Sequence, residues 1–258
     1  MYPILFHLYG PFSIHTYGVA IAIGFLCALF IARKDPRKKN IITDDQAVAL
    51  LCVSIIVGIF GARLFYFLIE CSTINWYDFF AFWQGGGSEL GSILAIIIFA
   101  SGYLYIYKIP ILPLLDIAST YAPLAQGFSR IGCFFAGCCH GLPTHSTCAI
   151  IYTDPNSLAP LNVPFFPIQL VMSISYFMLF FILFFIKAYF PKAGQLFTLY
   201  IMGASAIRFF VDFYRGDVIS KNTFSAYQLI AIALFFIALF GFLIIFKSSS
   251  RSQKNEHF

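Results

Sequence analysis

The chain has 258 residues, of which 60% are hydrophobic and only 10% are charged, and its formal net charge at pH 7 is +5. A soluble domain normally carries about 25% charged residues, so this composition excludes an ordinary soluble protein and indicates a polytopic membrane protein. The positive charge is concentrated in short loops, where it indicates membrane orientation and not nucleic-acid binding.

Repeated apolar runs of about 20 residues, the length that crosses about 30 Å of hydrocarbon, predict an all-α integral membrane fold with seven transmembrane helices. The predicted spans are 14–32, 46–69, 90–107, 114–137, 167–187, 194–214 and 225–246. We expect one transmembrane domain over residues 1–246 and a disordered polar tail over 247–258. The first run ends in a basic cluster instead of a small-residue cleavage site, which predicts a retained span and not a signal peptide.

Lysine and arginine residues predict the orientation of these spans. Most of them follow the first, third, fifth and seventh spans, starting at Arg33, Lys108, Lys187 and Lys247. The loops on the opposite side hold only Arg215 and Lys221. The positive-inside rule therefore places the N-terminus outside and the C-terminus in the cytoplasm.

The first span and the loop after the second carry weak motifs. His15 and Tyr17 open the first span, although tyrosine there is also common in interfacial aromatic belts. The loop 70–89 is rich in aromatic residues and ends in Gly85, Gly86 and Gly87. It is predicted to be an interfacial segment that gates lipid entry, or an aromatic belt with a turn.

Three arginines, Arg63, Arg130 and Arg208, lie inside the second, fourth and sixth spans, each six or seven residues before the outer end. At 1.5 Å per residue, all three start about 10 Å below the outer surface. An unpaired arginine at the centre of a membrane helix costs about 2.5–3.5 kcal/mol. Each arginine could pair structurally, but together they predict an anionic ligand, a phospholipid head group of the outer leaflet.

The end of the sixth span adds the one carboxylate that this sequence places near those arginines. Spacings of four and three residues put Arg208, Asp212 and Arg215 on one helix face. Asp212 either neutralises Arg208 or holds it in orientation for a ligand.

The stretch Ser129–Gly141, SRIGCFFAGCCHG, completes a pattern that resembles the prolipoprotein diacylglyceryl transferases of bacterial plasma membranes. The family signature G-R-x-G-N-F-x-N-G-E-x-x-G aligns with it without gaps. The matching residues in this stretch are Arg130, Gly132, Phe134, Gly137 and Gly141. Further matches follow in family order at His15, Tyr17, Gly18, Gly61, Arg63, Trp83, Gly85, Gly86, Pro167, Gln169, Leu170, Arg208, Asp212 and Arg215.

The resemblance implies a multi-pass enzyme of the bacterial plasma membrane. It would move diacylglyceryl from phosphatidylglycerol, or another anionic phospholipid, to the lipobox cysteine of a prolipoprotein signal peptide, releasing glycerol phosphate. The predicted catalytic residues are Arg130, Arg208, His15, Tyr17 and Asp212, with His140 as a further candidate base. The predicted substrate-binding residues are Arg63, Gly132, Gln169, Arg215, Gly85 and Gly86. No cofactor, metal or nucleic acid is expected.

The chain departs from the family pattern at several polar positions. Leu90 replaces a family histidine implicated in catalysis, and Cys133, Ala136 and Cys138 replace two asparagines and a glutamate. These replacements indicate a divergent branch. Two alternatives therefore stay open: transfer of a lipid-derived group to another acceptor, or thiol redox or metal chemistry on the same scaffold.

Cysteines concentrate on the predicted outer side of the membrane, where disulfides persist. A disulfide from Cys148 to Cys138 or Cys139 is the first expectation. A reactive thiolate near Arg130 or His140 is the second. A metal site is a third alternative, built from Cys138, Cys139, His140, His145 and Cys148, although this spacing matches no standard zinc pattern.

Overall fold

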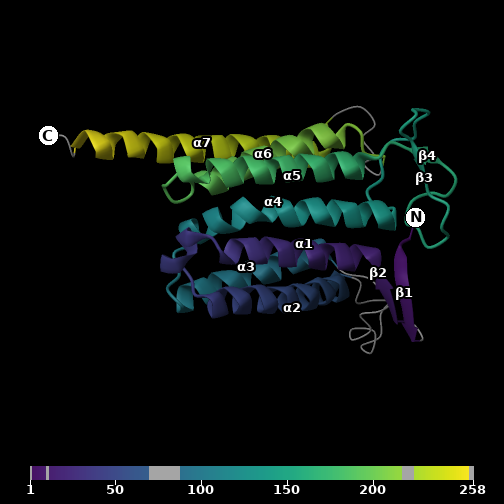
Figure 1. The fold of residues 1–258 in the computed structure, drawn as a ribbon, viewed down its shortest axis with the longest axis horizontal. Helices are drawn as coiled ribbons and strands as arrows, with labels where there is room; N and C mark the ends of the chain where they lie inside the picture. Colours follow the sequence, from purple (N-terminus) through teal and green to yellow (C-terminus); the bar gives the residue numbers. More distant parts are fainter. Residues whose placement is uncertain (1, 10–11, 70–87, 217–223, 256–258) are drawn as a thin grey trace. The chain divides into compact units, whose positions relative to one another are not determined.

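The computed structural model describes residues 2–9, 12–69, 88–216 and 224–255 (Figure 1). Within these ranges the chain forms seven α-helices. They are α1 (Thr16–Arg33), α2 (Asp44–Ile69), α3 (Glu89–Ile106), α4 (Ile111–Ala136), α5 (Ile168–Ile186), α6 (Gln195–Asp212) and α7 (Ala226–Asn255). Each helix overlaps one of the predicted apolar runs, so the prediction of an all-α membrane protein is confirmed.

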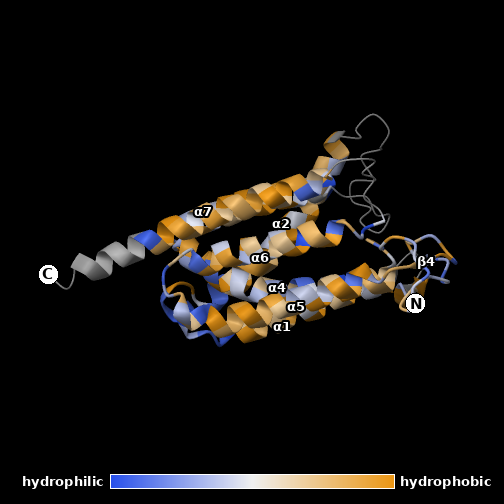
Figure 2. Ribbon diagram, turned by 90° about the horizontal axis from the view of Figure 1, so that it is seen from above, coloured by the Kyte–Doolittle hydropathy of each residue, from blue (hydrophilic) through white to orange (hydrophobic). Residues whose placement is uncertain are grey.

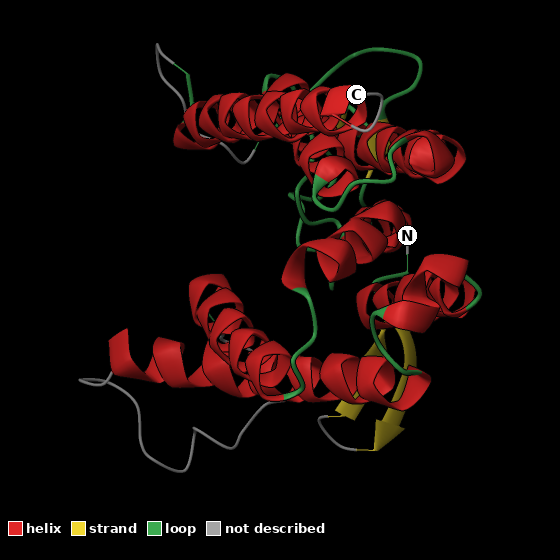
Figure 3. Cartoon of the chain, turned by 90° about the vertical axis from the view of Figure 1, so that its left-hand side faces the viewer, coloured by secondary structure: helices red, strands yellow, loops and turns green. Residues whose placement is uncertain are grey.

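Short strands and 3-10 turns make up the rest of the regular structure (Figure 3). Strand β1 (Ile4–Tyr9) pairs antiparallel with β2 (Phe12–His15), and β3 (Ile150–Ile151) pairs antiparallel with β4 (Pro164–Phe165). The 3-10 turns η1 (Pro36–Asn40) and η4 (Lys187–Tyr189) follow α1 and α5. The β1–β2 pair was not predicted from the sequence.

Four helical stretches are long and apolar enough to cross a membrane, as judged over the described residues. They are Thr16–Arg33, Asp44–Leu68, Ile168–Tyr189 and Ala226–Lys247. The apolar part of α3, Gly91–Ile106, is shorter. Apolar residues line these helices and hydrophilic residues gather in the loops, as Figure 2 shows.

The prediction of a disordered tail from residue 247 is wrong for the backbone, because α7 continues to Asn255. The segment from Lys247 to Asn255 contains lysine, arginine, glutamine and serine but no proline or glycine. Nothing in this segment therefore breaks the helix after the apolar run ends.

The chain divides into two compact units, Pro36–Leu114 and Met1–Asp35 with Leu115–Phe258. The first unit is a pair of helices, α2 and α3, that cross at Gly61 and Gly91. A Cβ atom on Gly61 would overlap the Cβ of Ala95 and lie 2.7 Å from the Gly91 carbonyl oxygen. Only glycine allows these two backbones to approach so closely.

The second unit is organised around α4. A Cβ atom on Gly24 of α1 would lie 2.5 Å from the Cβ of Phe128, so α1 packs closely on α4. On another face of α4, the Ser173 hydroxyl of α5 donates to the Gly127 carbonyl at 2.9 Å. Met172 of α5 and Leu196 of α6 are fully buried in the core between these helices.

Asp116, near the start of α4, joins α4 to α6. Its carboxylate oxygens accept hydrogen bonds from the amides of Gly194 and Phe197, at 2.6 and 2.7 Å. These amides belong to the first turn of α6, where helical N–H groups have no partner within the helix. The buried carboxylate also complements the positive end of the helix dipole.

A second polar cluster ties the end of α1 to α4 and α5. The Tyr121 hydroxyl donates to Asp35 at 2.6 Å, and the Lys187 ammonium lies 3.3 Å from the same carboxylate oxygen. These two polar clusters therefore fix the first half of α4, the helix that also carries Arg130, to neighbouring segments.

Candidate functional site

The loop after α4 is held between two other segments of the same unit. The Leu142 amide donates to the Tyr214 carbonyl at 2.9 Å, and the Phe166 amide donates to the Leu142 carbonyl at 3.0 Å. The Gly216 amide donates to the His140 carbonyl at 3.1 Å. These hydrogen bonds fix the loop that contains Cys138 and Cys139, the cysteine loop, against the segment that carries Arg215.

Two residues with positive φ turn the chain at the end of α4. Gly137 has φ +78°, and a Cβ atom there would overlap the Ser157 side chain. Cys139 has φ +53°, in the left-handed region that residues other than glycine rarely adopt. Such a conformation costs about 1–3 kcal/mol and persists only where the surrounding contacts impose it.

Gln169 supports this loop from α5. It is 1% exposed, and its Nε2 donates to the Cys138 carbonyl at 3.0 Å and to the Tyr152 hydroxyl at 3.2 Å. The Tyr152 hydroxyl donates in turn to the Phe134 carbonyl at 3.1 Å. Burial raises the pKa of Tyr152 to about 12, so this hydroxyl keeps its proton and its donor role. The amide predicted to bind substrate is engaged in holding the loop.

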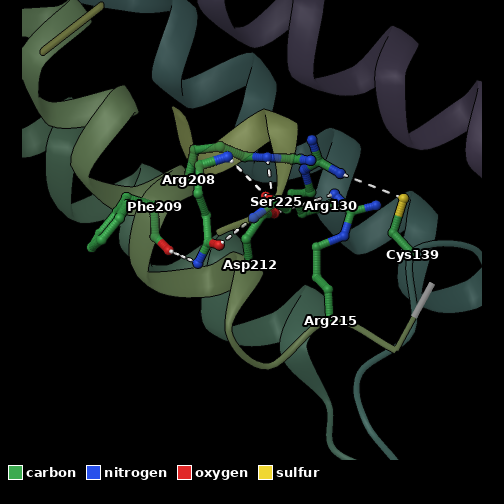
Figure 4. Close-up of polar contacts among 8 residues, drawn as sticks. Arg130, Cys139, Arg208, Phe209, Asp212, Arg215 and Ser225 are labelled. Atoms are coloured by element: carbon green, nitrogen blue, oxygen red, sulfur yellow. Dashed lines mark hydrogen bonds and ion pairs between the residues drawn. The ribbon is translucent and has the colours of Figure 1, made fainter. Parts of the chain in front are cut away.

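Asp212 lies between two arginines at the end of α6 (Figure 4). Its Oδ1 is 3.0 Å from Arg208 Nε and 4.0 Å from Arg215 Nη1. The Ser225 hydroxyl donates to its Oδ2 at 3.2 Å. The predicted common face of Arg208, Asp212 and Arg215 is thus present, and the carboxylate side chain is fully buried.

Arg130 reaches the same region from α4. It interacts electrostatically with both Arg208 and Arg215. Its Nη1 is 3.9 Å from the sulfurs of Cys133 and Cys139. Two guanidinium groups therefore lie against Asp212 and a third lies near them, so positive charge exceeds negative charge among these described side chains.

Two tyrosines near these arginines were not identified from the sequence. Tyr176 of α5 is 6% exposed and interacts electrostatically with Arg130 and Arg208. The Arg208 guanidinium lies 4.9 Å from the centre of the Tyr227 ring of α7, a cation–π contact. Tyr176 follows Gln169 by two helical turns and so shares its face of α5, a spacing that could have revealed it.

Three thiols gather beside Arg130. The sulfur atoms of Cys133, Cys138 and Cys139 all lie within 4.8 Å of one another. Hydrogen bonds from the Cys133 and Cys138 thiols lower the pKa of Cys139, and the positive charges of Arg215 and Arg130 lower it further. The pKa of Cys138 is raised, because its hydrogen bonds to these neighbours favour the protonated thiol.

Cys148, the expected disulfide partner, is exposed and free, and Cys138 and Cys139, which are half-buried, are also free. The structure thus groups Cys138 and Cys139 with Cys133 and not with Cys148. The histidines of the expected metal site are also absent from the cluster formed by the described residues.

The three candidate bases occupy different environments. His15 is exposed at the end of β2, and His140 places Nδ1 3.1 Å from the Gly141 carbonyl with its ring 4.4 Å from that of Phe165. Tyr17, in the first turn of α1, hydrogen-bonds with the Ser129 side chain and interacts electrostatically with Cys133 and Arg130. Of the three, only Tyr17 is close to the arginine cluster by these contacts.

Gly132 and Arg63, two further predicted residues, have other described surroundings. A Cβ atom on Gly132 would lie 3.1 Å from the Tyr17 Cα, so this glycine serves helix packing. Arg63 belongs to the other unit, where it is 6% exposed and lies 5.9 Å from the Tyr66 ring. Gly85 and Gly86, with the rest of the aromatic loop, lie outside the described residues.

An apolar groove reaches the arginine cluster within the unit that contains α4. This groove of about 210 Å³ between α6 and α7 is lined by Arg208 and Tyr227 and otherwise mainly by aliphatic side chains. A second apolar groove, of about 430 Å³, lies between α5 and α6 and includes Tyr214 in its lining. An apolar groove lined at one point by a guanidinium group is suited to a lipid with an anionic head group.

Comparisons with known proteins agree with this chemistry. Residues 3–244 match the family model described as prolipoprotein diacylglyceryl transferase. A Clostridium tetani protein named phosphatidylglycerol–prolipoprotein diacylglyceryl transferase is 35% identical over 248 residues, covering 95% of this chain and 98% of that protein. A Clostridium perfringens protein named phosphatidylglycerol–prolipoprotein diacylglyceryl transferase 2 is 33% identical over 264 residues, covering 98% of each chain. A Thermotoga maritima protein with the first of these names is 29% identical over 253 residues, covering 95% of this chain and 85% of that protein.

We predict that Gln169→Leu loosens the cysteine loop. The substitution leaves the Cys138 carbonyl and the Tyr152 hydroxyl without their shared donor, which costs about 1–3 kcal/mol of stability. Thermal unfolding in detergent should show the loss, and maleimide labelling of Cys138 should become faster. Ser175→Ala, on the exposed side of α5, is the control and should change neither. Unchanged unfolding and labelling in Gln169→Leu would contradict the supporting role.

Proposed function

The chain belongs to the prolipoprotein diacylglyceryl transferase family, and we propose that it transfers diacylglyceryl from phosphatidylglycerol to the lipobox cysteine of a prolipoprotein. The names of its relatives give both substrates. The observation that carries the proposal is the cluster of Arg208 and Arg215 at Asp212 with Arg130 close to them, beside an apolar groove that Arg208 lines.

The reaction accounts for the surplus of positive charge. The acceptor sulfur forms a bond with the glycerol carbon of the lipid, the carbon–oxygen bond to the phosphate breaks, and glycerol phosphate leaves. Because the phosphate gains negative charge as this bond breaks, guanidinium groups aimed at it stabilise the transition state more than the ground state. We assign this role to Arg130 and Arg208, and phosphate binding to Arg215.

Asp212 positions Arg208 in this proposal. An ion pair with Nε fixes the guanidinium plane and leaves its two terminal nitrogens for a phosphate oxygen pair. Tyr17 is assigned as a hydrogen-bonding group that positions the acceptor thiol, whose proton passes to solvent, because the contacts of Tyr17 place it beside Arg130, whereas His140 Nδ1 lies against the loop.

The membrane arrangement is part of the proposal. We infer seven spans within one transmembrane domain, with the N-terminus outside and the C-terminus in the cytoplasm of a bacterium. The basic residues at the C-terminal ends of α1 and α7 and those after α3 and α5 support this orientation. The arginine cluster then lies in the outer half of the plasma membrane, within reach of outer-leaflet phosphatidylglycerol and a translocated lipobox.

The first test is transfer by the purified protein from phosphatidylglycerol to a lipobox peptide, measured as released glycerol phosphate. Arg130→Ala and Arg208→Ala should each lower kcat by about 100-fold or more, as loss of an oxyanion donor does. Arg33→Ala, an exposed arginine at the end of α1, is the matched control and should keep full activity. Release without the peptide, or by both arginine variants, would refute the assignment.

The Asp212→Asn variant tests whether Asp212 orients the Arg208 guanidinium or acts on lipid binding through its negative charge. The variant removes one negative charge beside Arg208, so binding of the anionic lipid should be retained or strengthened while turnover falls about 10-fold or more. The same assay checks this as a fall in kcat with a KM for phosphatidylglycerol that does not rise. A raised KM with unchanged kcat would mean that Asp212 serves lipid binding and not positioning. Tyr17→Phe, measured alongside, should lower kcat, because the hydroxyl that positions the acceptor thiol is lost.

Orientation can be measured with reporter fusions in intact cells. Alkaline phosphatase, which folds only outside the cytoplasm, should be active when fused after Cys148 and inactive when fused after Lys108. A fluorescent protein fused to Phe258 should be bright, because this end is predicted to be cytoplasmic. The reverse pattern would invert the proposed topology.

A further inference from the structure

The three thiols at the end of α4 have no role in the proposed transfer. Their sulfur atoms lie within 4.8 Å of one another, and they come from both sides of one turn: Cys133 from the helix, Cys138 and Cys139 from the loop. Three sulfurs that share one metal ion at about 2.3 Å lie about 4.0 Å apart. Small side-chain rotations would therefore bring the observed triangle to coordination distance.

The backbone around these sulfurs is shaped to hold them together. Gly137 and Cys139 both have positive φ, and this double turn returns the loop thiols to Cys133. The Gln169 side chain donates a hydrogen bond to the Cys138 carbonyl, and the Gly216 amide donates one to the His140 carbonyl. An uncommon backbone conformation fixed from two sides is the expected construction of a preorganised ligand set.

The chemistry of the ligands narrows the choice of ion. Thiolates are soft ligands that select Cu⁺ and Zn²⁺ over harder cations. Structural zinc takes four ligands, and among the described residues the group of histidine, cysteine and acidic side chains around this point contains only the three thiols. A three-coordinate soft cation fits this set better.

Of the two soft cations, Cu⁺ therefore remains. We propose that Cys133, Cys138 and Cys139 form a binding site for monovalent copper. Binding releases the thiol protons to solvent and forms three copper–sulfur bonds without any change in oxidation state.

The test is a Cu⁺ titration of the full chain in detergent, under anaerobic conditions and without lipid or peptide. Cu⁺, added as its acetonitrile complex, competes between the protein and the coloured chelator bathocuproine disulfonate. One equivalent should be withheld from the chelator. Cys133→Ser and Cys139→Ser should each weaken binding by about 100-fold or more, since even outer-shell changes cost metal sites 10–100-fold. Cys148→Ser, at an exposed free thiol, should retain it.

Wild-type protein provides a second measurement that does not depend on the folding of variants. Bound Cu⁺ should protect Cys138 and Cys139 from N-ethylmaleimide, while Cys148 continues to react, as peptide mapping by mass spectrometry can show. X-ray absorption at the copper edge should show a shell of sulfur neighbours.

Several results would overturn the site. These are no Cu⁺ withheld, equal retention by Cys133→Ser, Zn²⁺ held where Cu⁺ is not, or a disulfide between two of the three cysteines in protein purified without reductant. Because no transfer is measured, failure of this inference and failure of the proposed function are distinguishable.

Discussion

The charge balance at the end of α6 determines what the rest of this site can do. Asp212 is fully buried and neutralises about one of the guanidinium charges of Arg208, Arg215 and Arg130. Charged groups in a membrane interior persist only with partners or ligands. The helix packing, the cysteine loop and the apolar grooves all hold these arginines at one place. An anionic substrate supplies the negative charge that balances the arginines that Asp212 does not neutralise.

Small residues and a helix-capping carboxylate fix the helices that carry these arginines. Gly24 and Gly132 let α1 approach α4, and the Asp116 carboxylate fixes the start of α6 against α4. Arg130 and Arg208 are therefore presented by helices whose relative position is set by contacts distant from the arginines. Packing along the whole length of the helices offsets the electrostatic repulsion between these cations.

Much of this could be predicted from the sequence, because helical spans and charges in apolar runs follow simple periodicities. The face shared by Arg208, Asp212 and Arg215 is an example. The thiol cluster could not be predicted, because it depends on positive φ at Cys139, a conformation imposed by loop contacts. Tyr176 was missed because one tyrosine in an apolar helix looks like ordinary core. Gln169 was predicted to bind substrate, because a sequence does not show that a buried side-chain amide already donates to the Cys138 carbonyl.

The link from Asp116 to the first turn of α6 also bears on the order in which the chain assembles. The ribosome delivers α4 first, with a carboxylate whose partners, the amides of Gly194 and Phe197, have not yet been made. The buried carboxylate of α4 is satisfied only once α6 follows, so α4 reaches its native packing together with α6 and not before it.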